Sequence, residues 1–182
     1  MSNPKLWQQY QELLSKTDFV VTYSALADEI PIEEIPNFEL IKNKPKFVVP
    51  PTQKMEPKEI SKKIVAAFAT CTPPFRARPA PRSEVRLKGR LAQMGGLQPE
   101  ACPLLFLPGQ KFDITGTRHG RGFGWYDRLL AGLPNEWIRI GIATESQISH
   151  TPLIRNPWDQ PADWLIGEQN QRRWKIHKFL RK

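Results

Sequence analysis

The sequence predicts a single α/β domain of three layers, in which helices cover both faces of a largely parallel sheet. Short apolar and β-branched runs alternate along the chain with segments of helical spacing, which is the pattern of such domains. The most apolar run, LLFLP, shows no polar alternation, as expected for a strand buried on both faces. The chain has 182 residues, of which 40% are hydrophobic, so it is long enough to bury a core. We therefore expect residues 1–182 to form one domain.

The first half of the chain predicts two longer helices and two strands. Apolar residues recur at helical spacing over residues 6–14, and the β-branched and aromatic run at 19–23 predicts the first strand. The acidic, proline-marked ADEIPIEEIP after it indicates a loop with a short helix. A second short strand at 46–49 ends at two prolines. A proline followed by apolar residues at helical spacing then predicts an amphipathic helix over residues 57–71.

The second half predicts the central strands and the loop between them. The run at 102–108 predicts a buried strand that leads into a long glycine-rich loop, after which residues 125–133 return to helical spacing. Further strands are expected at 138–143 and 164–166. In open parallel sheets, ligands bind beyond the carboxyl ends of the strands. The glycine-rich loop follows such an end and is therefore the candidate binding site.

The formal net charge of +9 and the sequence pI of about 9.8 indicate an anionic partner, such as nucleotide phosphates, another polyanion or nucleic acid. Much of the excess lies in a Pro/Arg-rich loop at about 72–90 and in a basic C-terminal tail at 172–182. Repeated prolines make regular structure unexpected in the first of these. For the tail we expect a solvated, charged run that keeps the protein soluble.

The sequence predicts a cytoplasmic protein without a membrane span. No stretch approaches the ~18 to 20 apolar residues that a span requires, and the first residues show no basic region followed by an apolar one. Cys71 and Cys102 lie far apart and outside any Cys-x-x-Cys motif. They are expected to be free thiols.

Three features that favour anions coincide in the loop PGQKFDITGTRHGRGFGWYD. Glycine at alternate positions allows backbone N–H groups to turn toward one point and approach a ligand closely, although such a loop also occurs as a plain tight connection. Arg118 and Arg121 carry planar guanidinium groups that bind phosphate oxygens in pairs, and the following helix directs its positive end toward them. Phosphate is the expected ligand. The alternating glycines are Gly120, Gly122 and Gly124.

The residues around this loop leave alternatives open. A carboxylate at Asp127 would repel phosphates unless a cation lay between them, and Mg²⁺ is commonly held by one or two carboxylates together with substrate phosphates. Asp127 could equally cap the helix or pair with Arg128. Trp125 and Tyr126 could stack on a ligand ring or belong to the core, and His119 is expected to be a loop residue.

The combined string LLFLPGQKFDITGTRHGRGFGWYD resembles the signature of the 5-formyltetrahydrofolate cyclo-ligase (methenyltetrahydrofolate synthetase) family. That signature is an apolar strand, PG-x-x-FD, a short turn and R-x-G-x-G-x-G-Y-Y-D, from which this chain departs only at Trp125. VVTYSALADEIPIEEI resembles the family's first strand and folate-binding segment, and IRIGIATESQISHTPLIRNPWDQPADWLIGE resembles its closing stretch with H-D-x-x-V-D. The resemblance implies a cyclo-ligase-like domain of the NagB/RpiA/CoA-transferase type.

The resemblance also implies an ATP- and Mg²⁺-dependent enzyme that closes 5-formyltetrahydrofolate to 5,10-methenyltetrahydrofolate and releases ADP and phosphate. Such a phosphoryl transfer depends mostly on positioning and charge neutralisation. The family pattern implies catalytic roles for Arg118, Arg121 and Tyr126, and nucleotide contacts for Arg118, His119, Gly120, Arg121, Gly122, Phe123, Gly124, Trp125 and Tyr126. It implies folate contacts for Ser24, Glu29 and Trp125 and metal binding for Asp127 and Asp159, with Asp163 at the family's second aspartate position.

The chain departs from the family pattern at its start and near its end. Family members open with a longer basic helix that touches ATP, where this chain has Lys5, and Asn156 and Trp158 stand where the family has glutamate and histidine. These departures and the net charge favour an alternative, a non-catalytic relative that binds RNA or another polyanion. Against it, the sequence has no RNP aromatic pair or KH loop. A sugar-phosphate or coenzyme A binder on a related fold rests on fold analogy alone.

Overall fold

The computed structural model has an α/β fold with a six-stranded sheet and a smaller three-stranded sheet. It describes residues 3–51, 55–71, 103–169 and 173–179, so the loop expected at 72–90 lies outside the described residues. The helices are α1 (Pro4–Lys16), α2 (Pro57–Cys71) and α3 (Trp125–Ala131), with short 3-10 helices η1 (Ile32–Glu34), η2 (Phe38–Leu40) and η4 (Glu145–Gln147). The strands are β1 (Val20–Tyr23), β2 (Lys46–Val49), β3 (Leu104–Leu107), β4 (Lys111–Asp113), β5 (Arg118–His119), β6 (Ile138–Thr144), β7 (Ile148–Ser149), β8 (Trp164–Gln169) and β9 (Arg173–Lys178).

The large sheet has the strand order β2-β1-β3-β6-β8-β9. All neighbouring strands from β2 to β8 pair in parallel, and β9 joins β8 in the antiparallel direction. Because β2 and β3 lie on opposite sides of β1, the order of the strands reverses at β1. A reversal of this kind separates the loops that leave the carboxyl ends of the strands, and ligands bind in the resulting crevice.

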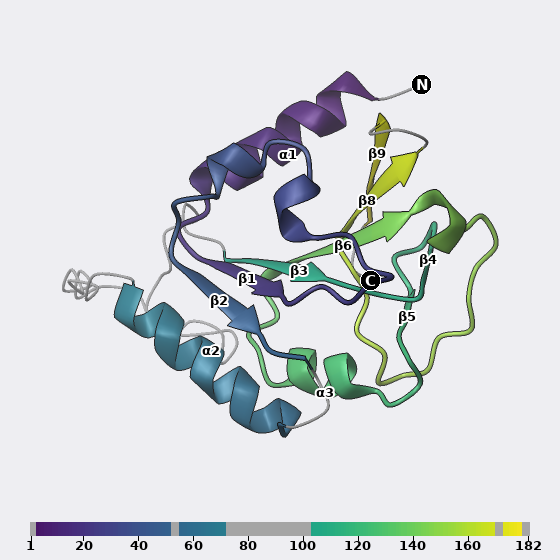
Figure 1. The fold of residues 1–182 in the computed structure, drawn as a ribbon. Helices are drawn as coiled ribbons and strands as arrows, with labels where there is room; N and C mark the ends of the chain where they lie inside the picture. Colours follow the sequence, from purple (N-terminus) through teal and green to yellow (C-terminus); the bar gives the residue numbers. More distant parts are fainter. Residues whose placement is uncertain (1–2, 52–54, 72–102, 170–172, 180–182) are drawn as a thin grey trace, which may run out of the picture.

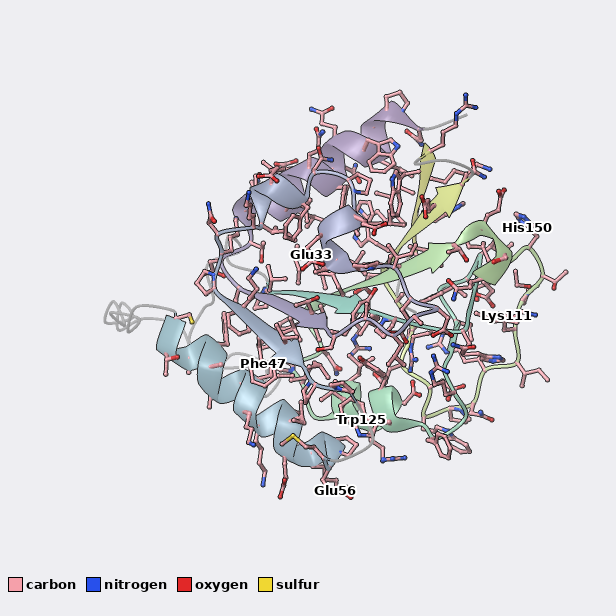
Figure 2. All side chains as sticks on the ribbon, viewed as in Figure 1. Glu33, Phe47, Glu56, Lys111, Trp125 and His150 are labelled. Atoms are coloured by element: carbon pink, nitrogen blue, oxygen red, sulfur yellow. The ribbon has the colours of Figure 1, made fainter. Side chains whose placement is uncertain are left out.

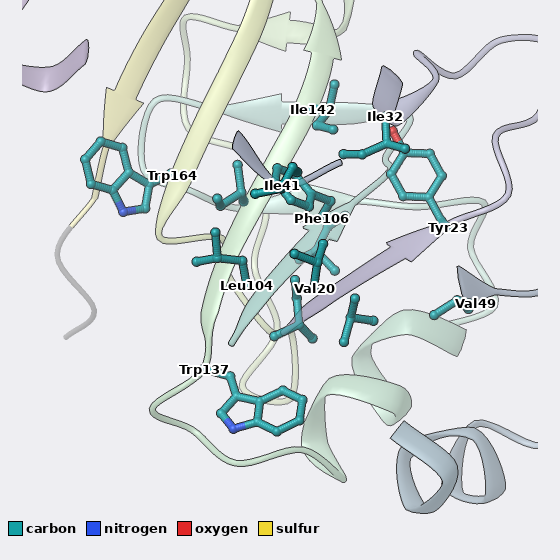
Figure 3. Close-up of a cluster of buried hydrophobic side chains, with 14 of the residues drawn as sticks. Val20, Tyr23, Ile32, Ile41, Val49, Leu104, Phe106, Trp137, Ile142 and Trp164 are labelled. Atoms are coloured by element: carbon teal, nitrogen blue, oxygen red, sulfur yellow. The ribbon is translucent and has the colours of Figure 1, made fainter. Parts of the chain in front are cut away.

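Helices cover both faces of this sheet, as the sequence predicted. Figure 1 shows α1 with the 3-10 helices η1 and η2 on one side and α2 with α3 on the other. All four residues of β3 are buried, which confirms that LLFLP is a central strand. Figure 3 shows the apolar side chains that fill the space around the sheet, with Trp137 near α3. None of the helices in the described part of the chain is long and apolar enough to cross a membrane.

The small sheet of β5, β4 and β7 was not predicted from the sequence. Its strands have two or three residues each and lie in polar, glycine-rich stretches, so no alternating pattern marks them. β4 pairs with β5 in the antiparallel direction and with β7 in parallel. The loop after β3 is therefore a hairpin tied to the segment after β6, and it presents Arg118 from a strand.

Asp113 holds this hairpin together from inside. Its fully buried side chain accepts hydrogen bonds through Oδ1 from the backbone N–H groups of Thr115 (2.8 Å) and Thr117 (2.9 Å). Oδ2 accepts a third, from the N–H of Leu153 at 2.7 Å. Burial alone would raise the pKa of Asp113, but these donors outweigh it and hold the pKa below its usual value. The carboxylate thus replaces the backbone pairing that such short strands cannot supply.

The expectation that the basic tail is a solvated run is wrong for residues 173–178. These residues form β9, which pairs with β8 from Trp164↔Lys178 to Gln169↔Arg173. Ile176 is buried in the core, and Lys178 Nζ lies 5.0 Å from the ring centroid of Trp164. Apolar Trp174 and Ile176 alternate with charged residues at the period of a strand, and this pattern outweighs the mutual repulsion of the cations.

We expect Ile176→Ala to lower the free energy of unfolding by about 2 to 5 kcal/mol, the usual cost of emptying a buried isoleucine site. Arg173→Ala in the same strand removes an exposed side chain and should change it by about 0.5 kcal/mol or less. Urea unfolding of both variants measures the difference. Equal, small effects would mean that β9 is not part of the stable core.

Asp113 should make stability depend on pH in the acid range. Because its pKa is lower in the folded state than the ~3.9 of an unfolded chain, its contribution is present above that value and is lost as pH falls through the folded pKa. At pH 7 we expect Asp113→Asn to lower the free energy of unfolding by about 1.5 to 3 kcal/mol, and the deficit should shrink as pH falls. Urea unfolding at several pH values measures it; a deficit independent of pH would contradict this role.

Candidate active site

A cavity of about 600 Å³ lies beyond the carboxyl ends of β1, β2 and β3, at the reversal of strand order. Its walls come from the segments that follow these strands and from residues 156–159. The structure brings all the site residues expected from the sequence to this one pocket: Ser24, Glu29, Arg118, His119, Gly120, Arg121, Gly122, Phe123, Gly124, Trp125, Tyr126, Asp127 and Asp159. Asp163 is not among the described residues that line it; its Oδ2 accepts a hydrogen bond from the backbone N–H of Arg139.

Some residues that line the pocket were not singled out from the sequence. Pro50 and Pro51 were interpreted only as the end of a strand, and Leu26 and Gln110 lie in stretches that resemble the family but were given no role of their own. The position of the prolines directly after a parallel strand was a usable signal, because the carboxyl ends of neighbouring parallel strands meet at one edge of the sheet.

The glycines of the loop serve two different local needs. Gly122 and Gly124 have φ angles of 89° and 57°, a left-handed conformation that other residues adopt at a cost. Gly120 instead makes room: a Cβ atom there would lie 2.9 Å from Nη1 of Arg118. The loop thus passes close over the Arg118 side chain and then turns into α3.

Arg118 and Asp127 form a buried ion pair beneath this loop. Nη2 of Arg118 donates to Oδ2 of Asp127 at 3.1 Å, and 3% and 15% of the two side chains are exposed. The guanidinium carbon lies 5.3 Å from the ring centroid of Tyr126. Of the open alternatives for Asp127, pairing with Arg128 and capping of α3 are not observed. Nε of Arg118 is buried without a hydrogen-bond partner among the described residues.

Asp127 also connects α3 to the opposite wall of the pocket. Its Oδ1 accepts a hydrogen bond from the backbone N–H of Gln160 at 3.0 Å. The side chain of Gln160 accepts one from Arg139 Nη1 at 2.8 Å and donates one to the carbonyl of Trp158 at 3.3 Å. The turn that carries Trp158 and Asp159 is thereby fixed to the sheet and to α3.

Glu29 and Tyr126 are ionisable groups whose pKa values the pocket shifts. Burial raises the pKa of Glu29, although the N–H of Leu26 donates to its Oε2 at 3.0 Å. Burial also raises the pKa of Tyr126, and the negative charge of Glu29 adds to this. At neutral pH the tyrosine hydroxyl therefore keeps its proton and remains a hydrogen-bond donor.

Trp125 and Tyr126 belong to the edge of the core and to the pocket wall at once. Both rings are partly buried against the main apolar cluster, and their centroids lie 5.2 Å apart. Nε1 of Trp125 donates to the carbonyl of Met55 at 3.0 Å. Figure 2 shows Trp125 at the start of α3, facing the beginning of α2 near Glu56. These contacts fix the rings before any ligand arrives.

Arg121 and His119 lie nearer the mouth of the pocket. Nη2 of Arg121 contacts Oδ1 of Asp28 at 2.6 Å, and about half of each side chain is exposed, 48% and 50%. Nε2 of His119 lies 2.7 Å from the carbonyl oxygen of Ile154. His119 lines the pocket, but it ends strand β5 and is not the loop residue that the sequence interpretation expected. The seven-residue helix α3 is short, so its dipole contributes less to anion binding than expected.

A metal ion has two candidate carboxylates in this pocket. Asp127 and Asp159 both line it, but no group of three or more metal-binding side chains occurs among the described residues. Both carboxylates already accept hydrogen bonds, Asp159 from the N–H of Asn156 at 2.7 Å. A carboxylate oxygen has more than one lone pair, so this donor set fits Mg²⁺ held jointly with substrate phosphates and does not form a metal site of protein ligands alone.

Comparisons with known proteins agree with the sequence resemblance. The 5-formyltetrahydrofolate cyclo-ligase of Mycoplasma genitalium is 31% identical over 70 residues, which are 38% of this chain and 41% of that protein. Two solved 5,10-methenyltetrahydrofolate synthetases are similar in structure. The one from Mycoplasma pneumoniae has 20% identity and a TM-score of 0.46, over 89% of this chain and 81% of its own. The one from Aquifex aeolicus has 19% identity and a TM-score of 0.49, over 100% of this chain and 87% of its own.

The aligned segment spans less than half of the curated relative from Mycoplasma genitalium. The sequence model of the 5-formyltetrahydrofolate cyclo-ligase family, by contrast, matches residues 5–168, nearly the whole chain. That match includes β1, the glycine loop and the wall at residues 156–159. The chain therefore belongs to the 5-formyltetrahydrofolate cyclo-ligase family.

Proposed function

We propose that this chain converts 5-formyltetrahydrofolate to 5,10-methenyltetrahydrofolate with consumption of ATP and release of ADP and phosphate. The observation that carries the proposal is the pocket at the strand-order reversal, where the glycine loop, the segment with Glu29 and the 156–159 wall meet. Its volume of about 600 Å³ is in the range of small-molecule sites. Membership of the family supplies the identity of the substrates.

The nucleotide is proposed to bind along the loop from Arg118 to Tyr126. Arg121 is half exposed at the mouth and can reach phosphate oxygens, whereas the buried Arg118 offers little surface and acts mainly by holding α3 and Tyr126 in place. The backbone of Gly122 is open, because a Cβ there would meet no atom within 4 Å. Together with the neighbouring loop residues His119, Gly120, Phe123 and Gly124, these groups form the proposed phosphate and adenosine contacts.

The folate is proposed to bind on the side of Ser24, Glu29 and Trp125. Burial raises the pKa of Glu29, which favours a carboxyl that exchanges a proton with the substrate. In the first step the formyl oxygen bonds to the γ-phosphorus and the bond to ADP breaks. In the second, the neighbouring amine bonds to the formyl carbon and gives up its proton to the phosphate that leaves. Arg121 and Tyr126 both line the pocket, and we propose that the guanidinium neutralises the developing charge while the tyrosine hydroxyl donates a hydrogen bond to it.

Mg²⁺ is proposed to lie between the phosphates and the carboxylates of Asp159 and Asp127, where it would supply charge neutralisation.

The exposed thiol of Cys71 suits a reducing compartment, which supports our proposal that the protein works in the cytoplasm.

The direct test is to incubate the purified chain with 5-formyltetrahydrofolate and Mg-ATP and follow the methenyl product by its absorbance. We expect product that requires both substrates, slower turnover in Arg121→Gln, and unchanged turnover in Glu39→Gln, an exposed site that does not line the pocket. A folded chain that binds ATP and makes no product would favour the non-catalytic alternative, and binding of RNA without ATP would favour the polyanion alternative.

Substitutions of Asp127 and Asp159 should have different effects, the first mainly on stability and the second mainly on metal-dependent binding of ATP. Asp127→Ala leaves the buried Arg118 charge without its partner and should lower the free energy of unfolding by about 3 to 5 kcal/mol. Asp159→Asn should cost about 1 kcal/mol or less. It should nevertheless weaken ATP binding measured with Mg²⁺, whereas without Mg²⁺ it should leave the affinity the same or higher, because a carboxylate that repels phosphates is removed. Calorimetric titration with and without Mg²⁺ checks this; equal weakening under both conditions would contradict a metal role for Asp159.

A further inference from the structure

The charges around the pocket do not by themselves favour a polyphosphate. The described residues that line it include two arginines and three carboxylates, Glu29, Asp127 and Asp159, and no lysine. Arg118 is neutralised by Asp127 within the buried pair. Among the described residues that line the pocket, the lysine or arginine charge that remains for phosphates at its mouth is that of Arg121, and a carboxylate already contacts it. The affinity for an anion therefore depends on what happens to this second pair.

Asp28 is firmly placed next to Arg121 although it does not itself line the pocket. Its Oδ1 contacts Arg121 Nη2 at 2.6 Å, and its Oδ2 accepts a hydrogen bond from Gln110 Nε2 at 2.9 Å. Its carbonyl lies 3.4 Å from Gln147 Nε2. The hydrogen bonds from Gln110 and Arg121 lower the pKa of Asp28, so the side chain is ionised at neutral pH.

We propose that Asp28 competes with the phosphates of the ligand for Arg121 and thereby sets the affinity of the pocket for anions. The inference rests on the proposed function, since it assumes that a nucleotide polyphosphate binds at the glycine loop. Arg121 leaves Asp28 when phosphate arrives, while Gln110 and Gln147 keep Asp28 in place. The exchange moves one side chain and does not require the loops to part.

The exchange is energetically feasible because the pair is exposed to water. Half-exposed ion pairs contribute little to stability, so little is lost when Arg121 turns toward a ligand. A doubly charged phosphate offers the guanidinium more charge than a carboxylate does and accepts two parallel hydrogen bonds. The contact with Asp28 must nevertheless be broken before Arg121 reaches a phosphate, and because salt screens this contact, the competition is weaker at moderate salt than at low salt. Asp28 is thus a residue that acts through Arg121 and has no contact of its own with the ligand.

The test uses the whole chain and compares Asp28→Asn with Glu39→Gln. Asn keeps the shape and one acceptor oxygen of Asp28 but removes its charge. Glu39 pairs with Lys42 at 3.3 Å on a surface away from the pocket, so Glu39→Gln matches the change in net charge and the loss of an exposed ion pair. Calorimetric titration with ATP, tripolyphosphate and adenosine at low and moderate salt gives the affinities. Thermal unfolding of each variant checks that it is folded.

We expect Asp28→Asn to tighten binding of ATP and tripolyphosphate by about threefold to tenfold at low salt, with a smaller gain at moderate salt and none for adenosine. Glu39→Gln should change none of these affinities. In an Arg121→Gln background the gain from Asp28→Asn should largely disappear, because the two residues act as one unit.

Three results would overturn the inference. Weaker ATP binding in Asp28→Asn would mean that Asp28 orients Arg121 for the ligand and does not compete with it. A gain that survives in the Arg121→Gln background would mean that Asp28 acts through its field alone. If the wild-type chain binds neither ATP nor tripolyphosphate, the proposed function fails and this inference fails with it, whereas binding by the wild type with no gain in Asp28→Asn refutes the inference alone.

Discussion

The buried pair of Arg118 and Asp127 is the interaction on which the rest of the site depends. An arginine taken out of water needs a charged partner with good geometry, and here the partner comes from the first turn of α3. The same carboxylate receives the backbone of Gln160, so one ionic contact joins the hairpin after β3, helix α3 and the far wall of the pocket. A side chain at Gly120 would push against the end of this arginine, because the chain passes directly over it. The signature that suggested phosphate binding therefore also contains the residues whose buried contacts hold the site together.

Because the same residues serve ligand binding and buried contacts, some parts of the site could be predicted from the sequence and others could not. The strands at β2, β3 and β6 follow from apolar runs bounded by prolines and turns, and the glycine loop follows from its position after a buried strand. The partner of Arg118 could not be predicted, because Asp127 lies nine residues away across a turn whose path the sequence does not specify. Asp28 and Arg121 are separated by 93 residues, so their contact arises only from the arrangement of β1 and β3 in the sheet. Local sequence patterns predicted the helices and strands. Contacts between these elements determine which charged side chains remain available to a ligand.

The small sheet shows a similar limit. Strands of two or three residues carry no periodic signal, and β4, β5 and β7 exist because Asp113 gathers the backbone N–H groups of two loops around one buried carboxylate. In the sequence that aspartate was simply the last letter of PG-x-x-FD. Its role is to place the hairpin, and through the hairpin Arg118, relative to the sheet. A short motif can therefore be recognised long before its physical reason is visible.

Strand β9 has a consequence for how molecules of this chain meet one another. It is the last strand of the large sheet, and within the described part of the chain no strand pairs with its outer side, which is therefore a template for a strand of a second molecule. Arg173, Lys175 and Lys178 place positive charges along this edge. Two such edges repel each other, and a neutral strand that paired here would leave those charges poorly hydrated. The cations of the last strand thus protect the sheet against edge-to-edge aggregation, while the apolar residues between them pack β9 against the core.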